Sequence, residues 1–134
     1  KPLDLIQPYR LEMGTSIAIN DYKNLYAFWK DTLTKDLNKS FTKDDFLVNL
    51  ASKEYSSAID FKQIKVPIIT PDFKDYKDGK LKTISFFAKK ARGSMVRFIL
   101  DNDVNSIEDL KLFNVDGYQF DVNLSNEKSF TFTR

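Results

Sequence analysis

Apolar side chains recur at three- and four-residue intervals in the first third of the chain, which predicts an amphipathic helix. Asn20 is a suitable N-cap for this helix, because its side-chain oxygen can accept a hydrogen bond from a backbone N–H of the first turn. The pattern ends near Lys39. We expect the apolar stripe to face the core, and its members are Tyr22, Leu25, Tyr26, Trp29, Leu33 and Leu37.

Two β-hairpins are predicted from alternating runs of apolar residues. The first joins strands at residues 66–73 and 81–87 across Asp78–Gly79, since Asp-Gly favours the positive φ angles of a tight hairpin turn. The second joins residues 117–124 to residues 129–133. Adjacent hairpins argue against a purely parallel, doubly wound sheet.

The remaining elements complete an α/β fold of the mixed, α+β-like kind. Residues 46–50 are mostly apolar and predict a buried strand that leads into a short helix at residues 53–59. A second helix is expected at residues 88–100, and Ser106 with Asp109 resembles a capping box that opens a short helix through Leu112. We therefore predict a mixed sheet with β-hairpins and flanking helices, part of a larger single-domain fold.

The helix at residues 88–100 is amphipathic with one cationic side. At about 100° per residue, four of its positions share one quadrant, and these are Lys89, Lys90, Gly93 and Arg97. The residues expected to be buried lie on the other side, and they are Ala88, Ala91, Met95, Phe98 and Ile99. Arg92 lies at the edge. Glycine inside a helix costs about 1 kcal/mol relative to alanine, so Gly93 indicates close approach by a backbone or a phosphate.

Charge is segregated along the chain, although the net charge is only +2. Residues 74–97 carry eight Lys or Arg and two Asp, whereas residues 98–127 carry one Lys and seven Asp or Glu. Three interpretations remain open for the cationic helix. It contacts a polyanion such as a phosphate backbone, it binds a small phosphate ligand, or its cations brace the fold against Asp101, Asp103 and Glu108.

Composition limits the chemistry. The 134 residues include twelve Phe but no Cys and no His, which excludes thiol nucleophiles, disulfides and thiolate zinc sites from this chain and removes the usual acid–base side chain. No apolar stretch approaches the ~20 residues that cross a bilayer. We predict a cytoplasmic protein, with no cofactor and no metal. Because the chain opens at Lys1 without an initiator Met, we expect an N-terminal portion to be absent.

Weaker motifs accompany the cationic helix. Asp101-x-Asp103-x-Asn105 imitates the start of a calcium loop, but Ser106 replaces the required Gly and Leu112 the closing Glu, so we reject that site. A possible pocket is formed where a strand becomes a helix, by Asn49, Ser52, Glu54 and Tyr55. Ser52 is equally suited to be the N-cap of that helix.

Four segments, Pro2–Gly14, Leu25–Trp29, Val48–Tyr55 and Ala88–Met95, closely resemble the YaaA family of bacterial peroxide-stress proteins. The segment from Phe113 to Tyr118 and the terminal segment ending at Arg134 are similar to that family too, in the same order. The resemblance implies a cytosolic protein of about twice this length, so that residues 1–134 would be its C-terminal portion and the N-terminal half would be absent.

The family resemblance also implies a function. It implies resistance to hydrogen peroxide, limitation of free intracellular iron, and binding of DNA through a basic cleft. Backbone contacts would fall to Lys89, Lys90, Arg92, Gly93 and Arg97, with Arg10 and Lys53 as additions from family motifs. Because this half lacks His and Cys, an indirect effect on iron fits better than direct ligation. The alternative is an enzyme acting on a phosphorylated or nucleotide substrate, with Arg92 and Arg97 as anion clamps.

Overall fold

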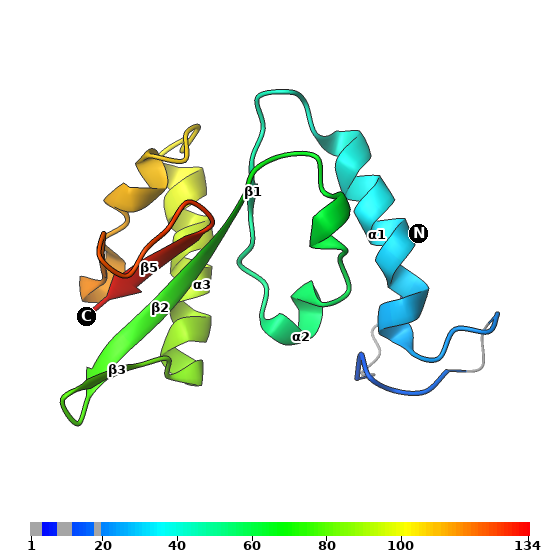
Figure 1. Cartoon of the computed structure of the whole chain (residues 1–134), viewed down its shortest axis with the longest axis horizontal. Coiled ribbons are helices and arrows are strands. Elements are labelled where there is room, and N and C mark those ends of the chain that lie inside the picture. Colours follow the sequence, from blue (N-terminus) through cyan, green and yellow to red (C-terminus); the bar gives the residue numbers. More distant parts are fainter. Residues whose placement is uncertain (1–3, 8–11, 18–19) are drawn as a thin grey trace. The chain divides into compact units, whose positions relative to one another are not determined.

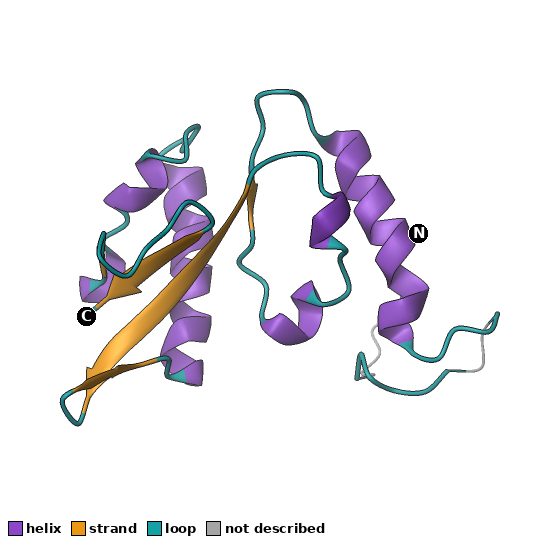
Figure 2. Ribbon diagram, in the orientation of Figure 1, coloured by secondary structure: helices purple, strands orange, loops and turns teal. Residues whose placement is uncertain are grey.

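The structure is a computed structural model that describes residues 4–7, 12–17 and 20–134 (Figure 1). The chain divides into two compact units. The first comprises residues 1–45 and 51–66, and the second comprises residues 46–50 and 67–134. Helices and strands are distinguished by colour in Figure 2. The prediction that all 134 residues belong to one larger domain stays a prediction.

The first unit is built around helix α1 (Leu25–Ser40). The predicted N-cap, Asn20, is wrong, because Asn20 has a φ of 47° and belongs to a turn before the helix. Asn24 is the N-cap instead, and its side-chain oxygen accepts a hydrogen bond from the N–H of Ala27 at 3.0 Å. Tyr22 consequently precedes α1 and is exposed, whereas Leu25 is buried as expected.

Polar side chains of α1 hold the rest of the first unit. The buried hydroxyl of Thr34 accepts a hydrogen bond from the N–H of Asp60 at 2.9 Å, just before the 3-10 helix Phe61–Gln63. Asn38 donates to the carbonyl of Gln63 and accepts from the N–H of Lys65, at 2.8 and 3.0 Å. These contacts position the segment that follows α2 (Lys53–Ser56), the short helix predicted at residues 53–59.

The second unit contains the predicted mixed sheet, in the order β1-β2-β5-β4. The central strand is β2 (Ile68–Lys77), which is parallel to β1 (Leu47–Val48) on one side and to β5 (Ser129–Thr133) on the other. Antiparallel partners complete the sheet: β4 (Gln119–Phe120) pairs with β5, and β3 (Lys80–Lys82) pairs with the end of β2. Both predicted hairpins are therefore confirmed.

Several boundary predictions are wrong. The strand predicted at residues 66–73 begins at Ile68 and continues to Lys77. The strand predicted at residues 81–87 ends at Lys82, and helix α3 (Ser85–Asp101) begins three residues earlier than expected. The turn itself is as predicted, with φ of 54° at Asp78 and 74° at Gly79. The apolar run was read as strand because short apolar runs do not distinguish strand from helix.

Local signals after α3 are confirmed in part. The hydroxyl of Ser106 accepts a hydrogen bond from the N–H of Asp109 at 3.1 Å, as a capping box requires, but the element it precedes is the 3-10 helix Asp109–Leu112. The strand predicted at residues 117–124 is reduced to β4. Residues 115–117 form a tight turn before it, in which Asp116 and Gly117 have positive φ. A second turn follows it, in which the carboxylate of Asp121 accepts hydrogen bonds from the N–H groups of Asn123 and Leu124 at 2.9 and 3.2 Å.

Aromatic rings fill the core between the sheet and α3. Phe73 of β2 lies 5.8, 5.3 and 5.5 Å from the ring centroids of Phe113, Tyr118 and Phe132. On α3 the inward side is made of Ala88, Ala91 and Met95, all buried. The two small side chains let the helix approach the sheet closely, so its opposite side faces outward.

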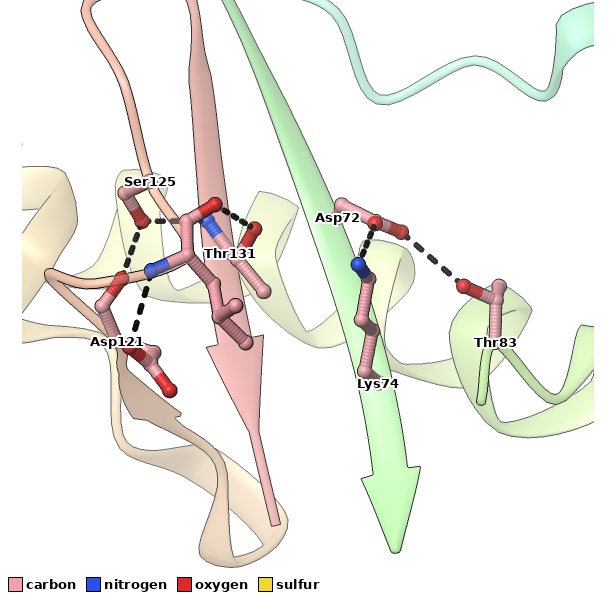
Figure 3. A network of polar contacts seen from close by, with 7 residues as sticks. Asp72, Lys74, Thr83, Asp121, Ser125 and Thr131 are labelled. Atoms are coloured by element: carbon pink, nitrogen blue, oxygen red, sulfur yellow. Dashed lines mark hydrogen bonds and ion pairs between the residues drawn. The ribbon is translucent and has the colours of Figure 1, made fainter. Parts of the chain in front are cut away.

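Two groups of polar contacts fix the loops around the sheet (Figure 3). Asp72 of β2 accepts a hydrogen bond from the hydroxyl of Thr83 at 3.4 Å and pairs with Lys74 at 3.5 Å. Thr83 stands two residues before α3, so this bond links the start of that helix to the central strand. In the loop after β4, the hydroxyl of Ser125 accepts from the N–H of Thr131 at 2.9 Å.

Candidate functional site

Helix α3 carries the predicted cations on its outward side. Lys89, Lys90, Gly93 and Arg97 are all exposed, whereas Ala88, Ala91 and Met95 are buried and Phe98 and Ile99 are partly buried. The division into a cationic and a buried side therefore agrees with the helical periodicity of the sequence. Since the buried side is fixed in the core, the cations stand on a rigid element.

Two of the cations form ion pairs within the second unit. Lys90 Nζ lies 3.1 Å from Asp116 Oδ2, and Arg97 Nη2 lies 3.0 Å from Asp101 Oδ1. The Lys90 and Arg97 side chains remain 62% and 73% exposed in these pairs. Exposed pairs contribute about 0–1 kcal/mol each, because water and salt screen them. Such pairs compensate charge but brace the fold only weakly.

The other predicted bracing partners have different roles. Glu108 pairs with Lys111 at 2.6 Å, and in the part of the chain that the structure describes neither Glu108 nor Asp103 forms an ion pair with a cation of α3. Within the described part of the chain, Lys89 and Arg92 form no ion pair, so their charge is compensated least. Arg92 is only partly exposed, in agreement with its expected place at the edge.

Gly93 has free space around it. Apart from its two chain neighbours and the backbone of its own helix, no atom of the described residues lies within 4 Å of the position that a Cβ would occupy there, and its φ is not positive. Neither the helix nor its neighbours in the chain therefore require glycine at this position.

Sequence reasoning missed the apolar residues that share the outward side of α3. Phe86, Val96 and Leu100 are 74%, 44% and 65% exposed. At about 100° per residue they fall between the cations of the same face. The periodicity that located the cations was sufficient to find them, but the helix was expected to start at Ala88, after Phe86.

The remaining predicted site residues lie elsewhere. Arg10 is outside the described residues. Lys53, exposed on α2, is in the first unit, while α3 is in the second, and each unit is described by itself. The role of both in a shared site stays a prediction.

The possible pocket residues are likewise divided between the units. Asn49 follows β1 in the second unit and donates to the hydroxyl of Thr70 at 3.4 Å. Ser52 occupies the N-cap position of α2 but its side chain makes no capping hydrogen bond. Glu54 and Tyr55 are exposed on α2. A pocket made by these residues stays a prediction.

An ion pair of the second unit, between the buried Asp75 and the partly buried Arg134, had no signal in the sequence. Arg134 Nε donates to Asp75 Oδ1 at 2.6 Å, and its Nη1 donates to the carbonyl of Asp116 at 3.0 Å. The guanidinium lies 4.8 and 4.5 Å from the ring centroids of Phe87 and Tyr118. Asp75 itself is 5% exposed. The pair thus connects β2, β5, the turn at Asp116 and the first turn of α3.

Tyr118 completes this cluster. Its hydroxyl donates to Asp75 Oδ2 at 3.0 Å. Burial, reinforced by the hydrogen bond to Asp75 and the negative charge of that carboxylate, raises the pKa of Tyr118 to about 12. The phenol is therefore held protonated in its role as a donor.

This raised pKa predicts a loss of stability in alkali. An unperturbed tyrosine has a pKa near 10, so the folded state retains the Tyr118 proton more tightly than the unfolded state does. The contribution is complete below about pH 10 and is lost between about pH 10 and pH 12. Urea denaturation across this window should show the wild-type free energy of unfolding falling about 2–3 kcal/mol further than that of Tyr118→Phe. If the free energy of unfolding fell equally with pH in the wild type and in Tyr118→Phe, the raised pKa of Tyr118 would be contradicted.

Two surface hollows in the second unit contain none of these cations of α3. One, of about 570 Å³, is lined by Asp75, Tyr76, Lys77, Ile84, Phe87 and Arg134. The other, of about 380 Å³, is lined by apolar side chains that include Phe120 and Phe130 and by polar side chains that include Glu108 and Lys111. Among the described residues, none of the helices is both long and apolar enough to cross a membrane.

The fold and the cationic helix define an α/β protein with a mixed sheet and an exposed, positively charged helix face. The chain belongs to the YaaA family, because the sequence model described as peroxide stress protein YaaA matches residues 1–124. The UPF0246 proteins of Flavobacterium johnsoniae and Flavobacterium psychrophilum are 64% and 63% identical over 134 residues, and that of Shewanella sp. strain ANA-3 is 54% identical over 136.

These matches confirm the predicted resemblance and define its extent. Each alignment covers 100% of this chain but 53% of the relative. The chain therefore spans about half the length of these relatives, and it corresponds to their C-terminal half.

Proposed function

We propose that this chain is the C-terminal half of a cytoplasmic peroxide-stress protein that binds the DNA backbone through the cations of α3. Lys90 and Arg97 are the main contacts, and Lys89 and Arg92 add charge beside them. The family description supports the peroxide-stress role. The observation that carries the DNA proposal is a set of exposed cations on one side of a helix whose opposite side is buried.

The spacing of these cations suits a phosphate backbone. Lys90 and Arg97 are seven residues apart, which places them about 10 Å apart along the axis and on the same side of the helix. Arginine can donate two parallel hydrogen bonds to one phosphate. A helix held in the core by Ala88, Ala91 and Met95 presents both charges without reorganisation.

The intramolecular ion pairs do not oppose this role. Exchanging an exposed carboxylate for a phosphate oxygen costs little, since each exposed pair is worth at most about 1 kcal/mol. Asp101 and Asp116 then hold Arg97 and Lys90 in place in the absence of DNA. Contacts of this type read no sequence, because phosphates are the same at every base pair.

Protection of DNA links this binding to peroxide and iron. Iron(II) gives one electron to hydrogen peroxide, which yields iron(III), hydroxide and hydroxyl radical, and the radical attacks nearby DNA. A protein bound along the backbone competes with cations, iron included, for the phosphates. This half has no His and no Cys, so we propose that its part in limiting free iron is indirect.

The test is a salt-dependent DNA-binding titration of the full-length protein. Lys90→Ala/Arg97→Ala is expected to weaken binding to all sequences at least tenfold and to reduce the slope of log K against log salt by about 1.8, since each lost phosphate contact removes about 0.9. Lys80→Ala/Lys128→Ala removes the same charge from exposed sites outside α3 and should change both quantities less. Equal effects of the two double variants would reject the assignment.

Thermal unfolding of the same variants separates binding from bracing. We expect Lys90→Ala/Arg97→Ala to lose no more than about 2 kcal/mol, the sum of two exposed pairs. A larger loss would favour the interpretation in which these cations only stabilise the fold.

A further inference from the structure

The outward side of α3 has a second pattern, formed by its apolar residues. Positions 86, 89, 93, 96 and 100 follow one another at alternating intervals of three and four residues. They are occupied by Phe86, Lys89, Gly93, Val96 and Leu100, and we refer to this row as the α3 seam. Its three large apolar side chains, Phe86, Val96 and Leu100, are exposed. Single exposed apolar residues are ordinary, but three that recur on one face of a helix favour an interaction surface.

The spacing specifies what the seam fits. Alternating three and four residues is the heptad pattern, in which one helix face packs along a second helix at a small crossing angle. A sheet edge or a loop would not follow such a row over about four turns. The partner is therefore expected to be a helix.

Gly93 at the centre of the seam supports close packing. Glycine at this position weakens α3. No packing contact within the described residues explains why a glycine is there, because the space that a Cβ would occupy is open. A second helix crossing at Gly93 would account for it, because the absence of a side chain lets two helix backbones approach closely. Phe86 and Leu100 stand one heptad to either side, so they would contact the same helix.

Charges border the seam. In heptad terms Lys90 and Arg97 occupy equivalent positions along one edge, and Arg92 lies on the other edge. Such edge positions determine the choice of partner through charge. The complementary helix would carry an apolar row bordered by Asp or Glu. Lys89, within the seam, can extend its ammonium group past the apolar contacts to water.

We infer that the α3 seam docks an amphipathic helix from the N-terminal half of the full-length protein, the part of the relatives that this chain does not match. A contact within one polypeptide favours this occupant over a second molecule, because the linked segment is present at high effective concentration. The inference goes beyond the proposed function. A docked helix would cover Lys89, which lies in the seam, but it would leave Lys90 and Arg97 at the edge, so the DNA titration of the Lys90 and Arg97 variants and the docking tests can fail separately.

The first test is Gly93→Ala in the full-length protein. On a solvent-exposed helix this substitution stabilises, since alanine has the higher helix propensity. At a close helix crossing the added methyl group separates the two helices, and we expect the melting temperature to fall by several degrees. A rise in melting temperature would overturn the inference.

The second test measures burial of the seam directly. This chain has no cysteine, so Val96→Cys places one reporter thiol in it, and labelling at that position is followed by mass spectrometry. In the native full-length protein we expect modification at least tenfold slower than at Lys80→Cys, an exposed control on β3. Equal rates would overturn the inference. Protection that disappears on dilution would also overturn it, because the occupant would then be a second copy.

Discussion

Replacing Phe73 with alanine is expected to lower the free energy of unfolding by about 3–5 kcal/mol, the usual cost of deleting a buried ring. Phe73 is 1% exposed and contacts the rings of Phe113, Tyr118 and Phe132. The substitution removes a side chain shared by β2, β5 and the segment before β4. Since the neighbouring rings are held by β5 and by the segment before β4, they can collapse into the cavity only in part.

Two control variants make this prediction specific. Phe73→Leu keeps most of the apolar volume and should cost about 1–2 kcal/mol. Tyr76→Ala removes an aromatic ring from an exposed position of the same strand and should cost less than about 1 kcal/mol. Urea denaturation followed by circular dichroism gives all three values. A Phe73→Ala loss no larger than that of Tyr76→Ala would show that the ring cluster is not the core.

Replacing Arg134 with leucine is the second substitution with a large expected effect, a loss of about 3 kcal/mol. Arg134 is the ion-pair partner of the buried carboxylate of Asp75, at 2.6 Å. Among the described residues, its removal leaves that charge with the hydroxyl of Tyr118 as its one remaining donor. An uncompensated buried charge is costly because it has lost its hydration without gaining an opposite charge.

A double-mutant cycle tests whether the pair is the cause. Asp75→Leu/Arg134→Leu removes both charges and should lose several kcal/mol less than the sum of the two single variants. As a control, Lys82→Ala removes one partner of the exposed pair with Asp78 and should cost less than about 1 kcal/mol. Additive losses in the cycle would mean that Asp75 and Arg134 stabilise the fold independently.

Helix α3 shows how far sequence alone leads to the site. Its cationic and buried sides follow from the identity of residues three and four positions apart, and both are as predicted. The start of α3 differs from the prediction, because contacts outside residues 83–87 decide whether that segment forms a strand or a helix. The bond from Thr83 to Asp72 connects residues eleven positions apart.

The ion pairs show the same limit. One of the three interpretations of the segregated charge was that the cations of α3 brace the fold against acidic residues further along the chain. Arg97 does meet Asp101, one turn away, and this pair follows from spacing. Lys90 meets Asp116 instead of Asp103 or Glu108, because the turn at Asp116 and Gly117 returns the chain to α3.

The sequence by itself determined the family, the mixed α/β class, the two hairpins and the outward cationic side of α3. Each of these depends on neighbouring residues or on long segments in register. Only the tertiary structure decided the strand order, the pairing of Asp75 with Arg134 and the aromatic cluster around Phe73. Those features join positions up to 59 residues apart, and they form because parallel strands β2 and β5 bring distant side chains onto one buried face. No local pattern encodes that pairing.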